Sequence, residues 1–380
     1  MTSLTFKSLN ERYGRQNCDQ LLQDLAVRLV DLLPDYVVGG RIGADTFAFL
    51  IVHQPDHRWV SVLANISKGL LGTSLSVKFG VVENVDHHLA VSLTCDHAIM
   101  ALERIKKAFG VDVVWYNDKL RERQHIENMI LESMETALEE HQFTVYYQPK
   151  HDLRNDRTGG AEALVRWIHP TLGFISPGDF IPIFERSGFI TKLDLYVCEE
   201  ACKQLKRCEE LGLPMVPISF NASQLDFDDE EFAHKIAALT DTYGIERSLL
   251  HVEVTETACA ENPEHVIDLL TDLREHGFHV ELDDFGSGYS SLASLNMLPL
   301  DVMKLDMSII RQASELDDFR IVQSAIQMAQ FLNLGTVAEG VETQDEMLKL
   351  KELGRGKIQG YYYSRPIMRE DFEAYLAKEA

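Results

Sequence analysis

The sequence lacks an apolar run long enough to span a membrane, and its first residues lack the basic, apolar and small-residue pattern of a secretory signal. It is also short of basic residues, with 36 Lys and Arg against 60 Asp and Glu and a formal net charge of −24. Because binding to a polymeric nucleic acid requires clustered Lys and Arg, this balance argues against such a partner. We expect a cytoplasmic chain without membrane contact of its own. A small anionic ligand is compatible with the charge where metal ions or a local arginine neutralise it.

Cysteine is scarce too, and its spacing does not match the common metal-binding motifs. The six cysteines form no CxxC pair, and no paired histidine motif accompanies them. Cys198 and Cys202 lie one helical turn apart, which is ordinary for buried thiols. The sequence therefore argues against a zinc site.

The chain has enough length for more than one core. Its 380 residues exceed an ordinary single domain, so we expect two. Residues 113–138 shift abruptly to charged side chains with apolar positions at helical spacing, which indicates a connecting helix. We assign residues 1–117 to a first domain, 118–138 to the connecting helix and 139–380 to a second domain.

The second domain alternates short β-type runs with amphipathic helical stretches, such as 195–211, 264–276 and 318–332. Strand-helix repetition on this scale predicts a (β/α)8 barrel with mostly parallel strands, and a doubly wound open sheet is the alternative. Asn262 and Pro263 suit the cap and first turn of one of these helices. The eight predicted strands are 143–148, 160–167, 216–222, 249–255, 279–284, 302–306, 335–340 and 357–363.

Polar residues follow the ends of these apolar runs. In a barrel, the carboxyl ends of the strands surround one site, so these side chains are expected to meet there. Each alone has a bland explanation as a salt bridge or a cap, but a ring of acids with an amide, a lysine and an arginine favours a functional site. The ring comprises Glu162, Arg166, Asn221, Glu253, Glu256, Asp283, Asp284, Lys304, Asp306, Glu339 and Gln359.

Two adjacent carboxylates, Asp283 and Asp284, stand where one run turns into a glycine-rich loop. Neighbouring side chains of a strand face opposite ways, and two acids so close are costly unless a cation lies between them. Either a divalent metal binds the pair, or one Asp caps a following helix.

The wider ring fits two metal ions, with Asp283 shared between them. Oxygen donors alone favour Mg²⁺ or Mn²⁺ over zinc, and a water held there would be made acidic. The first ion would take Glu162, Asn221 and Glu253, and the second would take Asp284 and Glu339.

Three further residues have proposed tasks. Lys304 would position or deprotonate the water, or else form an ion pair with Asp306. Arg166 lies four residues after Glu162 on the same side of its strand and suits a phosphate oxygen. Glu256 would tether the loop after Asp284, because alternation places it opposite Glu253.

These motifs together resemble the EAL family of cyclic di-GMP phosphodiesterases over roughly residues 123–380. The matching elements, in order, are Tyr147-Gln148-Pro149, Glu162-Ala163-Leu164-Val165-Arg166, Asn221-Ala222-Ser223, Glu253-Val254-Thr255-Glu256, Asp283-Asp284-Phe285-Gly286, Lys304-Leu305-Asp306, Glu339-Gly340-Val341-Glu342 and Gln359-Gly360-Tyr361.

The resemblance implies hydrolysis of cyclic di-GMP to linear pGpG with two Mg²⁺ or Mn²⁺ ions, and a homodimer through the barrel. It implies that Lys304, Glu339 and Glu162 are catalytic and that Glu256 anchors the loop. Deviations at Glu281 and Arg355 are expected to lie outside the chemistry. The implied metal ligands are Glu162, Asn221, Glu253, Asp283, Asp284 and Glu339, and the implied substrate-binding residues are Gln148, Leu164, Arg166, Asn221, Asp306 and Gln359.

The first domain resembles a GGDEF domain, a smaller α+β fold, through residues 6–14 and 41–47. Its signature reads Gly-Ala-Asp-Thr-Phe, with Thr46 where a carboxylate is needed. Residues 2–5 contain none of the expected metal-binding Asp, and Pro34 and Val37 replace the inhibitory Arg-x-x-Asp site. Cyclase activity is therefore not expected. The domain is either a scaffold, which we favour, or a regulatory module that holds GTP.

The complete set of metal ligands favours an active phosphodiesterase over its rival, a non-hydrolysing cyclic di-GMP receptor. Because the chain begins inside a GGDEF pattern, it is compatible with being the cytoplasmic part of a longer sensory or membrane protein.

Overall fold

A computed structural model describes residues 13–32, 38–43, 45–52, 77–86, 88–105, 113–261, 263–286, 295, 297–354 and 356–379. The chain divides into two compact units, Met1–Ile126 and Glu127–Ala380, and the division falls within helix α5 (Asp118–Glu139). Within the described residues, none of the helices combines the length and hydropathy needed to cross a bilayer. Several positions used above lie outside the described residues, namely 2–12, Pro34, Val37, Ala44, Asn262 and Arg355.

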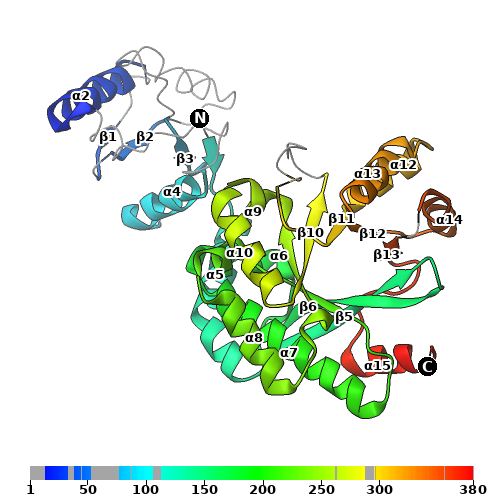
Figure 1. The fold of residues 1–380 in the computed structure, drawn as a ribbon. Helices are drawn as coiled ribbons and strands as arrows, with labels where there is room; N and C mark the ends of the chain where they lie inside the picture. Colours follow the sequence, from blue (N-terminus) through cyan, green and yellow to red (C-terminus); the bar gives the residue numbers. More distant parts are fainter. Residues whose placement is uncertain are drawn as a thin grey trace. The chain divides into compact units, whose positions relative to one another are not determined.

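The described part of the first unit is a small α+β structure (Figure 1). Leu21, Leu25 and Leu29 of its first described helix pack with Phe47 and Phe49. Its described elements are α2 (Arg15–Leu32), the antiparallel pair β1 (Val38–Arg41) and β2 (Phe47–Leu50), the parallel pair β3 (Phe79–Val81) and β4 (Val113–Trp115), and α4 (Val91–Ile105).

The second unit is a closed barrel, which confirms the predicted fold class. Eight strands form the ring β5-β13-β12-β11-β10-β9-β8-β6, and a pairing between β5 and β6 closes it. The strands are β5 (Phe143–Asp152), β6 (Arg157–His169), β8 (Ile218–Asn221), β9 (Leu250–Thr255), β10 (His279–Phe285), β11 (Val302–Leu305), β12 (Gly335–Ala338) and β13 (Lys357–Ile358).

Two features of the barrel differ from a regular parallel ring. Strand β5 runs antiparallel to both of its neighbours, β6 and β13. Strand β7 (Gly173–Ile175), which the sequence did not indicate, pairs antiparallel with the last residues of β6 and lies outside the ring. Because β5 and β6 are joined by a short turn, the chain can reverse there without a crossover helix.

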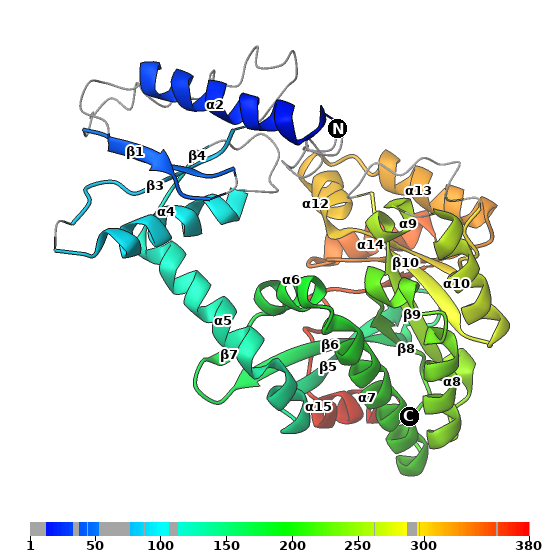
Figure 2. The ribbon, with the colours of Figure 1, turned by 90° about the vertical axis from the view of Figure 1, so that its left-hand side faces the viewer.

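Helices lie outside the ring of strands (Figure 1 and Figure 2). The three helical stretches expected from the sequence correspond to α7, α10 and α13, with ends that differ by one or two residues in α10 and α13, and α10 begins with Pro263 in its first turn. The α-helices described in this unit after α5 are α6 (Pro177–Ser187), α7 (Ile190–Leu211), α8 (Phe232–Tyr243), α9 (Glu256–Glu261), α10 (Pro263–Glu275), α12 (Met307–Glu315), α13 (Arg320–Phe331), α14 (Gln344–Leu353) and α15 (Arg369–Ala377).

The two faces of the barrel wall carry different side chains. On β9, Val252 and Val254 belong to the main apolar cluster, whereas His251 and Glu253 alternate with them and are also buried. Alternation therefore sends one set toward the helices and the other into the barrel. The barrel interior is filled largely by charged residues, which need partners there.

Candidate active site

Four carboxylates converge on the amino group of Lys304, which lies on β11 and is 1% exposed. The Nζ atom lies 2.6 Å from Glu253, 2.9 Å from Asp283, 2.8 Å from Glu339 and 3.6 Å from Glu162. These acids come from four different strands or strand ends, as a site at the carboxyl edge of a barrel requires. The predicted ring thus meets around one cation.

A β-bulge brings both members of the Asp pair to this point. Leu282 pairs with Met303 and Phe285 pairs with Leu305, so two residues of β10 oppose Lys304 alone. Asp284 takes a left-handed backbone with φ +57°, which Asp tolerates better than most residues. The bulge cancels the usual alternation. Carboxylate oxygens of Asp283, Asp284 and Glu339 consequently lie within 4.8 Å of one another.

Amide side chains line the other flank of the acids. Asn221 donates to Glu162 at 3.2 Å, and Gln359 donates to the second oxygen of Glu162 at 2.5 Å. Gln359 also donates to Gln148 at 3.1 Å, and Gln148 donates in turn to the Ser364 carbonyl. Strand β5 contributes because Gln148 pairs with Glu162 across the antiparallel ladder.

Glu256 lies where β9 passes into α9 and is buried. Its carboxylate accepts a hydrogen bond of 2.8 Å from the backbone N–H of Gly286, two residues after Asp284. Gly286 has φ +95°, a conformation that glycine adopts without strain. This contact is the geometry expected of a loop tether. The remainder of the glycine-rich loop lies outside the described residues.

The other proposed substrate-binding residues contact groups other than the acids around Lys304. Arg166 is half-buried, donates to the Val165 carbonyl, and lies 5.6 Å from the centre of the Tyr146 ring. Leu164 is half-buried on the same strand. Asp306 caps α12 by accepting from the Ser308 N–H at 3.0 Å.

Excess negative charge perturbs the acids. Burial raises the pKa of Glu339 to about 8, with Asp283 and Glu162 adding to the rise and Lys304 opposing it. Burial likewise raises the pKa of Asp283 and of Glu162. Burial alone would lower the pKa of Lys304, but the surrounding carboxylates raise it well above its ordinary value. The single positive charge of Lys304 thus cannot neutralise the four carboxylates that surround it.

This surplus fits divalent cations. Divalent cations would supply the positive charge that four carboxylates around one ammonium lack. The donors are carboxylate and amide oxygens, the ligands that Mg²⁺ and Mn²⁺ prefer. The residues present therefore suit the metals that the sequence predicts.

The sequence reasoning missed a second buried charge group deeper in the barrel. Lys150 contacts Glu253 at 2.8 Å and Glu281 at 2.6 Å, and His251 lies 2.6 Å from Glu281. Lys150 follows Gln148 by two residues, so period-2 alternation along β5 would have placed it inside the barrel. The expectation that Glu281 stands apart from the site overlooked this link, because Glu281 connects to Glu253 through Lys150.

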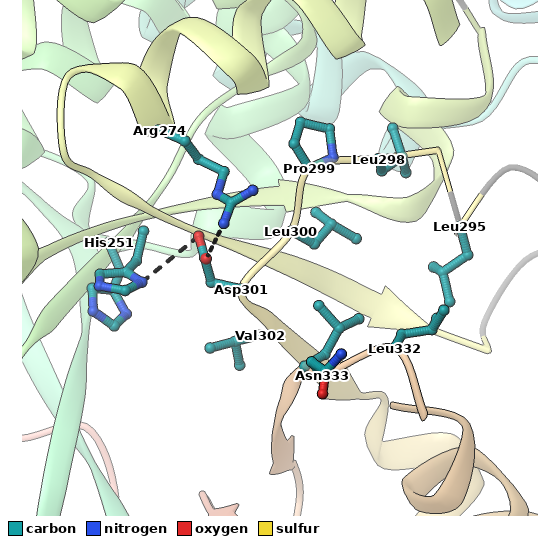
Figure 3. Close-up of a pocket in the computed structure, with 12 residues that line it drawn as sticks. His251, Arg274, Leu295, Leu298, Pro299, Leu300, Asp301, Val302, Leu332 and Asn333 are labelled. Carbon is teal, nitrogen blue, oxygen red and sulfur yellow. Dashed lines mark ion pairs between the residues drawn. The ribbon is translucent and has the colours of Figure 1, made fainter. Parts of the chain in front are cut away.

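A pocket at the amino-terminal ends of β10 and β11 is separate from the acids around Lys304 (Figure 3). Three of its polar residues pair with one another, since Asp301 lies 3.0 Å from Arg274 and 3.7 Å from His279. None of the described residues that line it is a proposed metal ligand.

Comparison with known proteins agrees with this geometry. Residues 131–366 match the EAL domain family, and residues 4–110 match the family described as diguanylate cyclase, GGDEF domain. The chain is 33% identical to the cyclic di-GMP phosphodiesterase NbdA of Pseudomonas aeruginosa, over 98% of this chain and 48% of that protein. It is 30% identical to the bifunctional diguanylate cyclase/cyclic di-GMP phosphodiesterase MucR of the same organism, over 98% of this chain and 56% of that protein.

Solved structures show the same relationship for the barrel. The structure of the PaMucR phosphodiesterase in complex with c-di-GMP matches with a TM-score of 0.61 and 35% identity, over 64% of this chain and 99% of that one. The chain spans about half the length of the curated relatives it matches. It belongs to the EAL domain family, and a region that matches the GGDEF domain precedes the barrel.

Proposed function

We propose that this chain hydrolyses cyclic di-GMP to linear pGpG with the help of two divalent cations, Mg²⁺ or Mn²⁺. The observation that carries the proposal is the convergence of four carboxylates on Lys304, with more negative charge than one lysine balances. A substrate with two phosphodiester groups is anionic, so this acidic site requires metal ions before it can accept such a ligand. The named activity of the relatives supports the same substrate.

The proposed ligands divide between two positions that share Asp283. Glu162, Asn221 and Glu253 would hold one ion, and Asp284 with Glu339 would hold the other. Bound metal ions of this kind lower the pKa of a coordinated water and neutralise charge on a reacting phosphate. Asp283 and Asp284 reach the same point because of the bulge in β10.

Lys304, Glu339 and Glu162 are the proposed catalytic residues. The ammonium of Lys304 would orient the attacking water and hold a proton at Nζ, and the three carboxylate oxygens within 3 Å of it support this role because they fix its direction. Glu339 and Glu162 would act through the ions that they hold, and Glu339 also lies 2.8 Å from the Lys304 ammonium.

The substrate would be bound by residues around the acidic cluster. Arg166 would contact a phosphate oxygen, for which its guanidinium is suited. Leu164 offers a half-buried apolar surface beside it. The amides of Gln148, Asn221 and Gln359 and the carboxylate of Asp306 supply hydrogen bonds. Glu256 would anchor the loop that follows Asp284.

The N-terminal domain is proposed as a scaffold without cyclase activity, because Thr46 replaces a carboxylate in its signature. We also propose a homodimer through the barrel, in a cytoplasmic setting. Light scattering of the purified chain tests the dimer.

The decisive experiment incubates the purified chain with cyclic di-GMP and Mg²⁺ or Mn²⁺ and separates the nucleotides by chromatography. We expect pGpG as the product, and we expect Glu162→Ala to bind cyclic di-GMP without turnover. Tight binding by the wild-type chain without product in either metal would contradict hydrolysis and would identify a receptor.

A further inference from the structure

The two carboxylate oxygens of Glu253 face different lysines. Oε2 lies 2.6 Å from Lys304, within the acidic cluster. Oε1 lies 2.8 Å from Lys150, which belongs to a different layer of the barrel. Glu253 is fully buried, so water does not replace either contact. Each carboxylate oxygen of Glu253 thus has its own lysine partner.

Lys150 is held in place by three partners. Its Nζ atom donates to Glu253 Oε1 at 2.8 Å, to Glu281 Oε2 at 2.6 Å and to the Ser219 hydroxyl at 2.7 Å. An ammonium has three protons, and each has an acceptor here. Lys150 is 2% exposed, so this arrangement is dry and its geometry is fixed.

Glu281 balances the charge of Lys150. Its second oxygen lies 2.6 Å from His251 Nδ1, and its side chain is 3% exposed. Lys150 and Glu281 are in direct contact at 2.6 Å, so one positive and one negative group are paired beneath the acidic cluster.

We propose that Lys150, fixed by Glu281 and Ser219, is a positioning residue that keeps Oε1 of Glu253 occupied and leaves Oε2 as the one oxygen offered to the acidic cluster. This inference rests on the proposed function, in which Glu253 is a metal ligand. Without Lys150, the buried carboxylate would be free to turn. Groups that orient a ligand from behind typically change metal affinity by about 10- to 100-fold.

The test measures Mn²⁺ binding to the full chain by the electron paramagnetic resonance signal of free Mn²⁺, without any substrate. The variant Lys150→Met/Glu281→Gln removes both charges of the pair, so the net charge of the chain is unchanged. We expect its Mn²⁺ affinity to fall about 10- to 100-fold. The matched control is Arg207→Met/Glu373→Gln, which removes an ion pair between α7 and α15 with the same charge change, and its affinity should equal that of the wild type.

A second variant keeps the proposal testable if the double variant does not fold. Glu281→Gln keeps the size of the side chain but leaves the charge of Lys150 unbalanced below the cluster, so we expect a weakening of about tenfold. If Lys150 only stabilised the fold, both variants would melt earlier but bind Mn²⁺ like the wild type, which would overturn the proposal. A wild-type chain that binds no Mn²⁺ would overturn it as well. Failure of the proposed function would instead appear as Mn²⁺ binding without hydrolysis of cyclic di-GMP.

Discussion

The barrel and the N-terminal unit hold their acidic residues in opposite ways. In the barrel, Glu162, Glu253 and Asp283 are packed around a buried lysine. In the N-terminal unit, Asp45 of the degenerate signature is exposed at the turn between β1 and β2, next to a half-buried Thr46. Across the described residues, the one group of three or more metal-type ligands lies in the barrel.

This difference shows what a buried acidic site demands of its surroundings. Enclosed carboxylates repel one another and lose hydration, so they persist only where a fold fixes cations beside them. The barrel supplies Lys304 and Lys150 from separate strands. The described part of the N-terminal unit has a much thinner core. We therefore assign the proposed chemistry to the barrel alone.

The largest effect is expected at the centre of the acidic cluster. Lys304→Met should lower the kcat for cyclic di-GMP about 10²- to 10⁴-fold, the usual contribution of a proton-transfer group, with little change in KM. Steady-state kinetics with saturating Mn²⁺ measure it. Lys349→Met, which removes ion pairs to Asp317 and Asp345 and a contact with the Phe319 ring, is the control away from the cluster. If the kcat of Lys304→Met stayed within about threefold of the wild-type value, Lys304 would have no part in the chemistry.

A smaller effect is expected at the loop tether. Glu256→Ala removes the acceptor for the Gly286 N–H and so loosens the chain beside Asp284. We expect activity at low Mn²⁺ to fall about 10- to 100-fold and to recover as Mn²⁺ is raised. Kinetics across a metal titration separate this from a catalytic loss. Glu246→Ala, an exposed residue bonded to Ser248, should leave the titration unchanged.

Buried acids outside the cluster should make the barrel sensitive to pH. Burial raises the pKa of Asp194 well above its ordinary value, and neighbouring Asp226 adds to the rise. Burial also raises the pKa of Asp226. An acid whose pKa is higher in the folded state stabilises the fold below its unfolded pKa and loses that contribution as the pH rises through the folded pKa.

The wild-type chain should therefore lose stability as the pH rises from weakly acidic values, and Asp194→Asn should lose less. Thermal melts over a series of buffers measure the two slopes. Asp228→Asn, an exposed substitution in the short 3-10 helix Gln224–Asp228 that contains Asp226, should keep the wild-type slope. Parallel slopes for all three proteins would show that Asp194 and Asp226 do not share a proton.

The smallest effect is expected in the N-terminal unit. Asp45→Asn and Thr46→Ala should change hydrolysis by less than about twofold, because surface substitutions rarely exceed about 0.5 kcal/mol. The same assay with cyclic di-GMP tests this. A loss as large as that of the Glu256 variant would break the contrast between the two units and give the signature a part in barrel chemistry.

The sequence predicted the barrel well because its wall has a strong pattern. Apolar residues that face the helices alternate with polar residues inside, as Val252, Glu253 and Val254 do on β9. The positions of Glu162, Asn221, Glu253, Asp283, Lys304 and Glu339 at strand ends were sufficient to predict that they meet.

The prediction from the alternation of polar and apolar residues missed three features of the barrel. Period-2 alternation carries no direction, so it could not show that β5 runs antiparallel. It could not reveal the bulge that turns Asp284 toward Asp283, because a bulge depends on the partner strand. Attention to strand ends also hid Lys150 and Glu281, which lie deeper in the barrel.

The antiparallel strand β5 also affects how the protein is made. Its free edge pairs with β13, the last strand of the ring, and Thr158 at the β5–β6 turn donates to Glu379, 221 residues later in the chain. During synthesis, the β5–β6 hairpin emerges early, yet the ring cannot close until β13 has left the ribosome. Until then, the edge of β5 that pairs with β13 is unpaired, and the charged residues of the barrel interior remain exposed to water. Folding of the barrel is therefore expected to be a late and slow event of high contact order, with a nascent chain that is vulnerable to aggregation.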